Sequence, residues 1–428
     1  MVAAVLVAVG IGYPLGRVRG AGALDGVWAE DGANFLHDAA NKSVVDAVTT
    51  PLNGYWHLYA RLLAEITTAF PVSAWAAVNG TLAALSTAGL ALIVYVASSG
   101  HLRHPALRLL AAAPVVTQWA SAGEVAANVA TLQFPALYAL FWVLLHVPAR
   151  RAGMVAAPIF SGLVALSTTL VVALLPLALA RAVLRRDRAG VLTLAALGLG
   201  TTVQLLGLAT GRAQRGDLGE PRYEPVWILD QFAVLQVPVA YLGEIWIRGY
   251  QLLGQPLVRV NEHRALILLG WLVPLAALTL ALLRRTRPGW LLAAVAALHA
   301  LGIFGLQIAL LGHVPGRYLV PSTLLLVTTA IALLRPWSWT SGFSWKGRNG
   351  LGAAPIVALA SLLTVVSIAN YRTTHIWRTP DVPGWRGQVV ANREKCTADP
   401  TLPAVTFRSG PADKKAWGTF DLPCPRLR

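Results

Sequence analysis

Charged residues are scarce in this chain. Only 13% of its 428 residues are Asp, Glu, Lys or Arg, 56% are hydrophobic, and the mean hydropathy is +0.59. A soluble domain of this length would need about a quarter of its residues charged to cover its surface. The deficit excludes a soluble protein and, because the apolar runs are continuous, indicates an all-α polytopic membrane protein.

Several catalytic motifs are missing as well. The sequence has no Walker loop, HExxH, GxSxG or CxxC, so NTPase, zinc-protease and serine-hydrolase chemistry have no support. His299 is the one ionisable group that we place deep within an apolar run, where a lone histidine is usually a packing residue. Ion-coupled transporters need acids or bases near the membrane midplane, so this scarcity disfavours that class.

The chain has only two cysteines, Cys396 and Cys424, both in its polar final segment. A metal site would need more ligands, and the nearest histidine is His375. In an oxidising compartment the pair would form a disulfide, which matters in a segment this short. We therefore expect residues 371–428 to form a small disulfide-linked domain.

Apolar runs of helical length follow one another through residues 1–370. A helix needs ~20 residues to cross a bilayer, so we predict a bundle of about eleven transmembrane helices. The first run has no basic leader or cleavage site and is expected to be a membrane helix rather than a signal peptide. Ser167–Thr169 predicts a turn between two short helices. The runs cover 2–15, 72–98, 107–120, 129–147, 153–167, 169–184, 189–209, 265–283, 289–311, 318–334 and 351–370.

The net charge of +16 comes mainly from arginine, which clusters in short loops between the runs. The positive-inside rule explains these clusters without nucleic acid and makes this side cytoplasmic. We therefore expect a plasma-membrane protein with its N-terminus inside and its C-terminus outside. Of the 19 carboxylates only Asp187 would then face the cytoplasm, so the chemistry is expected outside. The clusters are 101–104, 150–151, 185–188, 284–287 and 335–348.

Three predicted outer segments are long enough to carry function: 16–71, 210–264 and the tail from Tyr371. The first contains the acidic pair Glu30–Asp31 and then Tyr55–Ile66, whose mixed pattern is typical of an interfacial helix. The middle of the second, Val226–Tyr250, is apolar enough to lie along the membrane or dip into it.

The acidic pair is the first candidate site. Acids at the ends of membrane helices are costly to hold and tend to be functional. A partly desolvated carboxylate can act as a general base toward an acceptor hydroxyl, and Asp38 and Asp46 could serve in the same way. The alternative for the pair is a solvated loop acid or a helix N-cap, and the sequence leaves both interpretations open.

Other polar groups lie at the same predicted surface. Arg317, between His313 and Tyr318, can pair with a phosphate at headgroup depth, although an anchoring belt would look similar. Glu124 and Asn128 predict either a lined cavity or hydrogen bonding between helices.

A second pair of cations, Arg212 and Arg215, could hold a phosphate or diphosphate. A solvated loop explains them at least as well.

These features resemble the GT-C superfamily of membrane glycosyltransferases, which use polyprenyl-phosphate sugars. Glu30–Asp31 matches its acidic pair, Pro51–Tyr59 is similar to the Pro- and Tyr-rich stretch before its interfacial helix, and Gly316–Pro321 looks like its Arg-Tyr-x-x-Pro helix start. The tail is far smaller than the carbohydrate-binding modules of some actinobacterial arabinosyltransferases.

The resemblance implies an inverting glycosyltransferase of cell wall biosynthesis. A hexose or pentose would move from a polyprenyl-phosphate donor to a cell-envelope glycan or lipid acceptor, with Asp31 or Glu30 as the general base. No cofactor is required, and a divalent cation would be compatible. The residues implied to hold the donor phosphate are Arg317, Tyr318, His313, Arg212 and Arg215. Those implied to contact sugar or acceptor are Trp28, His57, Glu124 and Asn128.

Other function classes fit part of the pattern. A flippase for lipid-linked glycans would need a continuous polar path, which the uncharged runs disfavour. A polymerase or ligase with a lipid-diphosphate donor would use similar chemistry. Additional cations on the outer side would favour it, and the group Arg212, Arg215 and Arg222 supports this alternative. In a non-enzymatic scaffold the acidic pair would be replaceable without loss.

Overall fold

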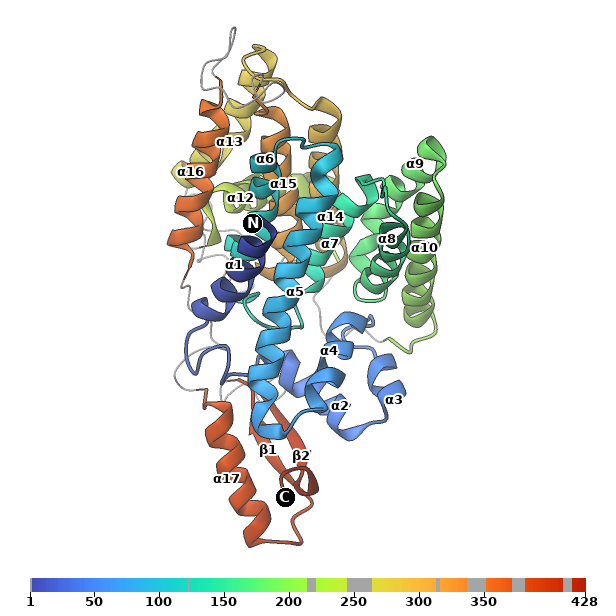
Figure 1. Cartoon of the computed structure of the whole chain (residues 1–428), viewed down its shortest axis with the longest axis vertical. Helices are drawn as coiled ribbons and strands as arrows, with labels where there is room; N and C mark the ends of the chain where they lie inside the picture. Colours follow the sequence, from blue (N-terminus) through green and yellow to red (C-terminus); the bar gives the residue numbers. More distant parts are fainter. Residues whose placement is uncertain are drawn as a thin grey trace.

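Most of the chain is helical in the computed structural model. The structure describes residues 2–121, 123–213, 221–244, 264–312, 316–336, 352–371, 382–410 and 418–428. Long helices form the upper part of the molecule in Figure 1, and the first loop packs with the C-terminal segment in the lower part. We call the lower part the loop end of the bundle.

Within the described residues, six helical segments are long and apolar enough to cross a membrane, which supports an integral membrane protein. Three other apolar helices are shorter, so eleven spans remains a prediction. The six segments are Val72–Gly100, Arg188–Ala209, Pro225–Leu242, Arg264–Leu282, Trp290–Leu311 and Gly316–Leu333. The shorter helices are Gln133–Leu145, Arg151–Ala165 and Ala354–Ala369.

The centre of the bundle is built on two helices, α7 and α15, in which nearly every side chain is buried. The other bundle helices pack around this pair and around one another. The bundle helices are α1 (Val2–Arg17), α5 (Trp75–Ala97), α6 (Pro105–Thr117), α7 (Gln133–Leu145), α8 (Arg151–Ala165), α9 (Leu175–Arg185), α10 (Arg188–Ala209), α12 (Val237–Leu242), α13 (Arg264–Leu282), α14 (Trp290–Leu311), α15 (Leu319–Leu333) and α16 (Ala354–Ala369).

The loops that the arginine pattern assigns to one side meet at one end of the bundle. Two neighbouring cavities there share Gly100 and His101 in their linings and draw other lining residues from every arginine-bearing loop. We call this the arginine end; its assignment to the cytoplasm remains a prediction. The loop residues that line the two cavities include Arg103, Arg150, Arg185, Arg287 and Arg335.

The predicted turn at Ser167–Thr169 is confirmed. Helix α8 ends at Ala165, and a short 3-10 helix over Thr169–Leu174 begins after the turn, capped by the Thr168 hydroxyl. The predicted single run 169–184 is therefore divided between this 3-10 helix and α9.

The predicted outer segment 210–264 contains a helix that the sequence interpretation did not count as a span. Helix α11 (Pro225–Gln231), a π-helical turn (Phe232–Gln236) and α12 (Val237–Leu242) form one continuous segment long enough to cross a membrane. The sequence shows this part of the chain to be apolar but, because polar residues interrupt it, predicts that it lies along the membrane or dips into it. In the structure Gln236 is buried, and its amide nitrogen donates to the Thr323 hydroxyl at 3.0 Å, which links the π-helical turn to α15.

The first loop folds as short helices at the loop end. The predicted interfacial helix corresponds to α4, whose buried face includes Arg61. This guanidinium donates to Asp38 at 2.9 Å and to the carbonyl of Ala47 at 2.7 Å, which ties α4 to the helices before it. These elements are a π-helical turn (Asp31–Leu36), α2 (His37–Asn41), α3 (Val44–Thr49) and α4 (Leu58–Thr68).

The C-terminal segment packs against the first loop and shares its core. It contains α17 (Trp385–Ala398) and an antiparallel pair, β1 (Ala404–Arg408) with β2 (Thr419–Pro423). The predicted disulfide between Cys396 and Cys424 is present. Aromatic side chains from both segments form one apolar cluster, so the tail is not a separate core; they include Phe35, Trp75, Trp385, Phe407 and Phe420.

Candidate functional site

Three charged side chains from distant parts of the chain meet at the loop end. Arg317, in the 3-10 turn Gly316–Tyr318 before α15, forms an ion pair with Glu124 and lies 3.6 Å from Glu30 (Nη2 to Oε1). The other Glu124 oxygen accepts a hydrogen bond from the Arg317 backbone N–H at 3.1 Å. Both carboxylates are buried, whereas 25% of the Arg317 side chain is exposed. We call these residues the carboxylate–arginine cluster.

Two residues predicted to contact sugar support the carboxylates of this cluster. The indole Nε1 of Trp28 donates to Glu30 at 2.8 Å. Asn128 donates to the backbone carbonyl of Glu124 at 2.6 Å and accepts from the backbone N–H of Thr131 at 3.1 Å. Both side chains are buried, so they fix where the two carboxylates lie. Their contact with a sugar remains a prediction.

Asp31 has different surroundings from its neighbour in the acidic pair. It is fully buried and accepts hydrogen bonds from the Asn79 amide (2.7 Å) and the backbone N–H groups of Val129 (3.0 Å) and Ala130 (2.9 Å). Burial raises the pKa of Asp31 to about 7, although these hydrogen bonds act in the opposite direction. Asp31 thus links the first loop to α5 and to the segment that carries Glu124.

We expect the contribution of Asp31 to the free energy of unfolding to fall as the pH rises from about 4 to about 7. The pKa of Asp31 is higher in the folded protein, about 7, than in an unfolded chain, about 3.9. Its stabilising contribution is therefore complete below the unfolded pKa and is lost as the pH rises through 7. The Asp31→Asn variant cannot titrate at this position, so the thermal midpoint of the wild type in detergent should lose ground relative to that of the variant as the pH rises through this range.

The matched control is Asp399→Asn. Asp399 is exposed, and its hydrogen bonds from Thr401 lower its pKa, so it stays ionised over this range. This variant should keep the wild-type pH dependence. An unchanged dependence in Asp31→Asn would contradict the assignment to Asp31.

Aromatic residues lie next to the cluster. The Arg317 Cζ is 5.7 Å from the centre of the Tyr318 ring, and the Tyr318 ring packs against Phe134. Tyr55 accepts a hydrogen bond on its hydroxyl from the Gln133 amide at 3.0 Å. Burial raises the pKa of Tyr55 well above its usual value, so its hydroxyl remains protonated at neutral pH.

His57, another predicted sugar contact, stacks on Tyr55 with ring centroids 4.1 Å apart. Among the described residues neither of its ring nitrogens has a hydrogen-bond partner. Burial lowers the pKa of His57 to about 3, so the imidazole is neutral at pH 7. It supports the Tyr55 ring and has unused hydrogen-bonding capacity.

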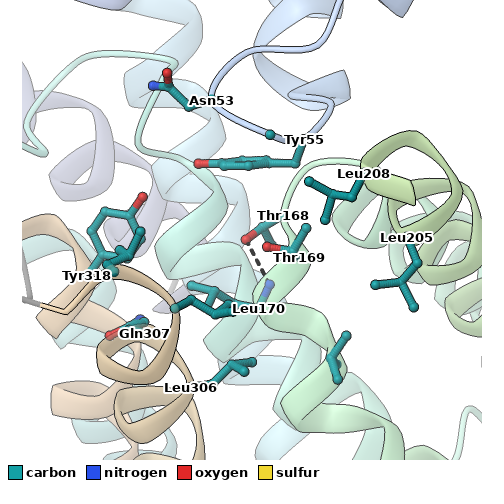
Figure 2. A pocket seen from close by; sticks show the side chains of 14 residues that line it. Asn53, Tyr55, Thr168, Thr169, Leu170, Leu205, Leu208, Leu306, Gln307 and Tyr318 are labelled. Atoms are coloured by element: carbon teal, nitrogen blue, oxygen red, sulfur yellow. Dashed lines mark hydrogen bonds between the residues drawn. The ribbon is translucent and has the colours of Figure 1, made fainter. Parts of the chain in front are cut away.

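An apolar pocket of about 230 Å³ extends from these tyrosines into the bundle (Figure 2). Tyr55 and Tyr318 lie at one edge, and leucines from α10 and α14, Leu205 and Leu306 among them, form much of the wall. The other lining residues come from 53–54, from 168–172 and from Gln307. The pocket therefore joins an apolar interior to the tyrosines beside the charged cluster.

Gln307 is a lining residue that the sequence interpretation missed. It lies on α14 and is fully buried, and among the described residues neither atom of its amide has a hydrogen-bond partner. A buried polar group without a partner costs roughly 1–3 kcal/mol, so this position suits a ligand with a polar atom. Apart from Trp290 at its first position, His299 is the only other hydrogen-bonding side chain of α14. It bonds to the carbonyl of Val295 at 2.7 Å and packs edge-on against the Phe141 ring.

Asn79 and Tyr55 were also not predicted from the sequence to be part of the site. An amide inside an otherwise apolar run was the available signal for Asn79, as it was for Gln307. Tyr55 stood within the stretch singled out before the interfacial helix, but nothing in its spacing indicated that it would lie beside Arg317.

Several predicted site residues are not brought to the cluster. Asp38 is bound by Arg61 and by Lys42, and Asp46 shares a hydrogen bond with Ser43 at the start of α3. Burial alone would raise the pKa of Asp38, but hydrogen bonds from His37, Lys42 and Arg61 hold it well below its usual range. These two acids have structural partners.

The remaining cations are separate as well. Arg212 is exposed just after α10 and, within the described part of the chain, has no ion pair. Arg215 and His313 lie outside the described residues. In those residues no three His, Cys, Asp or Glu side chains are grouped to hold a metal ion, and Arg317 supplies the positive charge between Glu30 and Glu124.

Comparison with known proteins returned no relative. No family model matches the chain, and no curated protein and no solved structure matches it.

Proposed function

We propose that the protein is a membrane glycosyltransferase that moves a sugar, with inversion, from a polyprenyl-phosphate donor to a hydroxyl of an envelope glycan or lipid. The observation that carries the proposal is the carboxylate–arginine cluster beside the mouth of an apolar pocket. An isoprenoid chain suits the pocket, and a phosphate-linked sugar and its acceptor suit the cluster.

The donor side rests on the pocket and on Arg317. Leucines from α10 and α14 would cover part of the isoprenoid chain. Tyr55 and Tyr318 have apolar rings and polar hydroxyl groups, which suits the position where the chain ends and the phosphate begins. Arg317 is the one arginine in the cluster within the described residues, so the site favours a monophosphate over a diphosphate.

The two carboxylates hold Arg317 unequally, which suggests how it could serve a phosphate. Glu124 binds both its guanidinium and its backbone N–H, whereas Glu30 is 3.6 Å away. A donor phosphate would displace Glu30 from Arg317 more readily than Glu124. The displaced Glu30 would then be available to an acceptor.

In the reaction that follows, Glu30 takes the proton of the acceptor hydroxyl. The acceptor oxygen forms a bond to the anomeric carbon, and the bond from that carbon to the phosphate oxygen breaks. The electron pair leaves with the polyprenyl phosphate, whose charge Arg317 stabilises. Asp31 acts as a positioning residue, because its three hydrogen bonds fix the loop that carries Glu30 against the segment that carries Glu124.

The direct test is sugar transfer by the purified protein with a panel of polyprenyl-phosphate and polyprenyl-diphosphate sugars and an extract of envelope acceptors. Transfer with a monophosphate donor supports the proposal. Transfer only with diphosphate donors would indicate a polymerase or ligase. Absence of transfer, together with movement of a lipid-linked glycan across vesicle membranes, would replace it with a flippase.

The pocket gives a second prediction. Filling it with Leu306→Trp should raise the apparent KM for a long-chain donor roughly tenfold, because the lost apolar contact is worth about 1–3 kcal/mol. A donor with two isoprene units should be affected less. Leu298→Trp, which changes an exposed position on the same helix, is the matched control. Equal KM values for Leu306→Trp and Leu298→Trp would place the isoprenoid elsewhere.

A further inference from the structure

A polar cavity of about 270 Å³ lies at the arginine end, beyond the C-terminus of α5. Its ionisable lining residues are all basic: Arg103, Arg287, Arg335, His101 and His104. We call it the basic pocket. Asn79, which binds Asp31, lies near the start of the 23-residue α5, so the two sites are separated by most of a helix about 35 Å long.

The basic pocket is a built feature of the fold, because Arg335 ties two loops together. Its guanidinium donates to the carbonyl of His101 and to the carbonyl of Arg287, each at 3.2 Å. The backbone N–H of Arg287 donates in return to the carbonyl of Arg335 at 2.8 Å. These bonds use backbone oxygens and leave the positive charge of Arg335 in place.

No carboxylate is among the lining residues in the described part of the chain. Burial and the neighbouring charges of Arg287 and Arg103 lower the pKa of Arg335. Burial, Arg185 and Arg335 lower that of His101, against one hydrogen bond to the carbonyl of Leu145. Cations gathered without acids in the wall favour an anion.

The surroundings indicate what carries the anion. Three of the segments able to cross a membrane have one end at this pocket: Val72–Gly100, Trp290–Leu311 and Gly316–Leu333. Leu107 and Pro336 complete its wall, and the first residues of α14, Trp290 and Leu291, are 45% and 79% exposed. A charged cavity bordered by exposed apolar side chains at the end of membrane helices suits a headgroup attached to acyl chains.

We propose that the basic pocket binds the phosphate of an anionic phospholipid, whose acyl chains lie along the exposed faces of α6 and α14. The site needs only a phosphate that carries a net negative charge and an attached apolar chain. Its occupation is independent of sugar transfer at the loop end.

The test measures the thermal midpoint of the full-length protein in detergent with short-chain phosphatidylglycerol, short-chain phosphatidylcholine or inorganic phosphate. Phosphatidylglycerol should stabilise the wild type with a saturable dependence. Arg103→Gln/Arg287→Gln should weaken its apparent Kd roughly tenfold or more, since each basic residue contributes about 1 kcal/mol near an anionic lipid. Both residues are exposed, so the fold should tolerate the change.

Arg188→Gln/Arg285→Gln is the matched control. It removes the same charge from exposed positions that are not part of the pocket lining, and it should bind as the wild type does. Equal weakening by both double variants would reduce the effect to general attraction and overturn the proposal. Equal stabilisation by phosphatidylcholine would overturn the requirement for an anion. Equal stabilisation by inorganic phosphate would overturn the assignment to a lipid.

Discussion

Replacement of Glu30 by glutamine should lower sugar transfer roughly 10²–10⁴-fold, the range over which a positioned general base acts. Glutamine keeps the size of the side chain and can still accept the hydrogen bond from Trp28. It cannot take a proton from an acceptor hydroxyl. The loss should therefore appear in kcat, with the KM for the donor changed little, in steady-state assays of the purified protein.

Two comparisons make this result specific. Glu394→Gln, at an exposed position of α17, should retain wild-type transfer. Asp31→Asn should lower activity only as far as it lowers the fraction of folded protein. Asp31 is buried and its oxygens already accept three hydrogen bonds, so it is not available to an acceptor. If Asp31→Asn lost transfer while folding normally and Glu30→Gln kept it, the base would be Asp31.

Replacement of Arg317 by glutamine should produce the other large effect. Loss of the charge that stabilises the leaving phosphate should cost about 10²–10³-fold in transfer. It would also leave the buried carboxylates of Glu30 and Glu124 without their shared cation. Breaking a fully buried ion pair costs about 3–5 kcal/mol, and the partial exposure of Arg317 should make the loss of stability smaller than that.

The double variant Arg317→Gln/Glu124→Gln separates the two effects. Removal of one carboxylate should restore much of the lost stability, measured as the thermal midpoint in detergent, without restoring transfer. Arg386→Gln, at an exposed position of α17, should leave both quantities unchanged. Recovery of transfer in the double variant would show that Arg317 serves only to neutralise Glu124.

The sequence predicted the charged residues of this site but did not show which role each of them has. Glu30, Glu124 and Arg317 were each singled out, because a charged side chain in an apolar protein is costly and so conspicuous. Their contact depends on packing of Arg317 across 287 residues to Glu30 and 193 residues to Glu124, which no local pattern contains. The difference between Glu30 and Asp31 arises from what surrounds two adjacent residues, so their order in the sequence gave no means of ranking them.

For the fold, too, the sequence predicted local elements but not how they pack. Long apolar runs indicated membrane helices, and the Ser167–Thr169 turn followed from its hydroxyl residues. The segment Pro225–Leu242 was expected to lie along the membrane or dip into it and was not counted as a span, because hydropathy cannot distinguish a polar residue that bonds to another helix, such as Gln236, from one that faces water. The core that the tail shares with the first loop could not be predicted either, because the sequence does not show which residues the aromatic side chains of the tail will contact.

That shared core has a consequence for the order in which the protein is made. Ser409 donates to the carbonyl of Ala29, and a Cβ on Gly32 would lie 2.7 Å from Ser409 and 2.9 Å from the Phe420 ring. Glycine at position 32 thus allows the first loop to pack closely against the C-terminal segment. The first loop leaves the ribosome early, whereas Ser409, which covers it, follows Ala29 by 380 residues. Until this later segment has been made and Cys396 has met Cys424, the acids of the loop lack the support of the shared core.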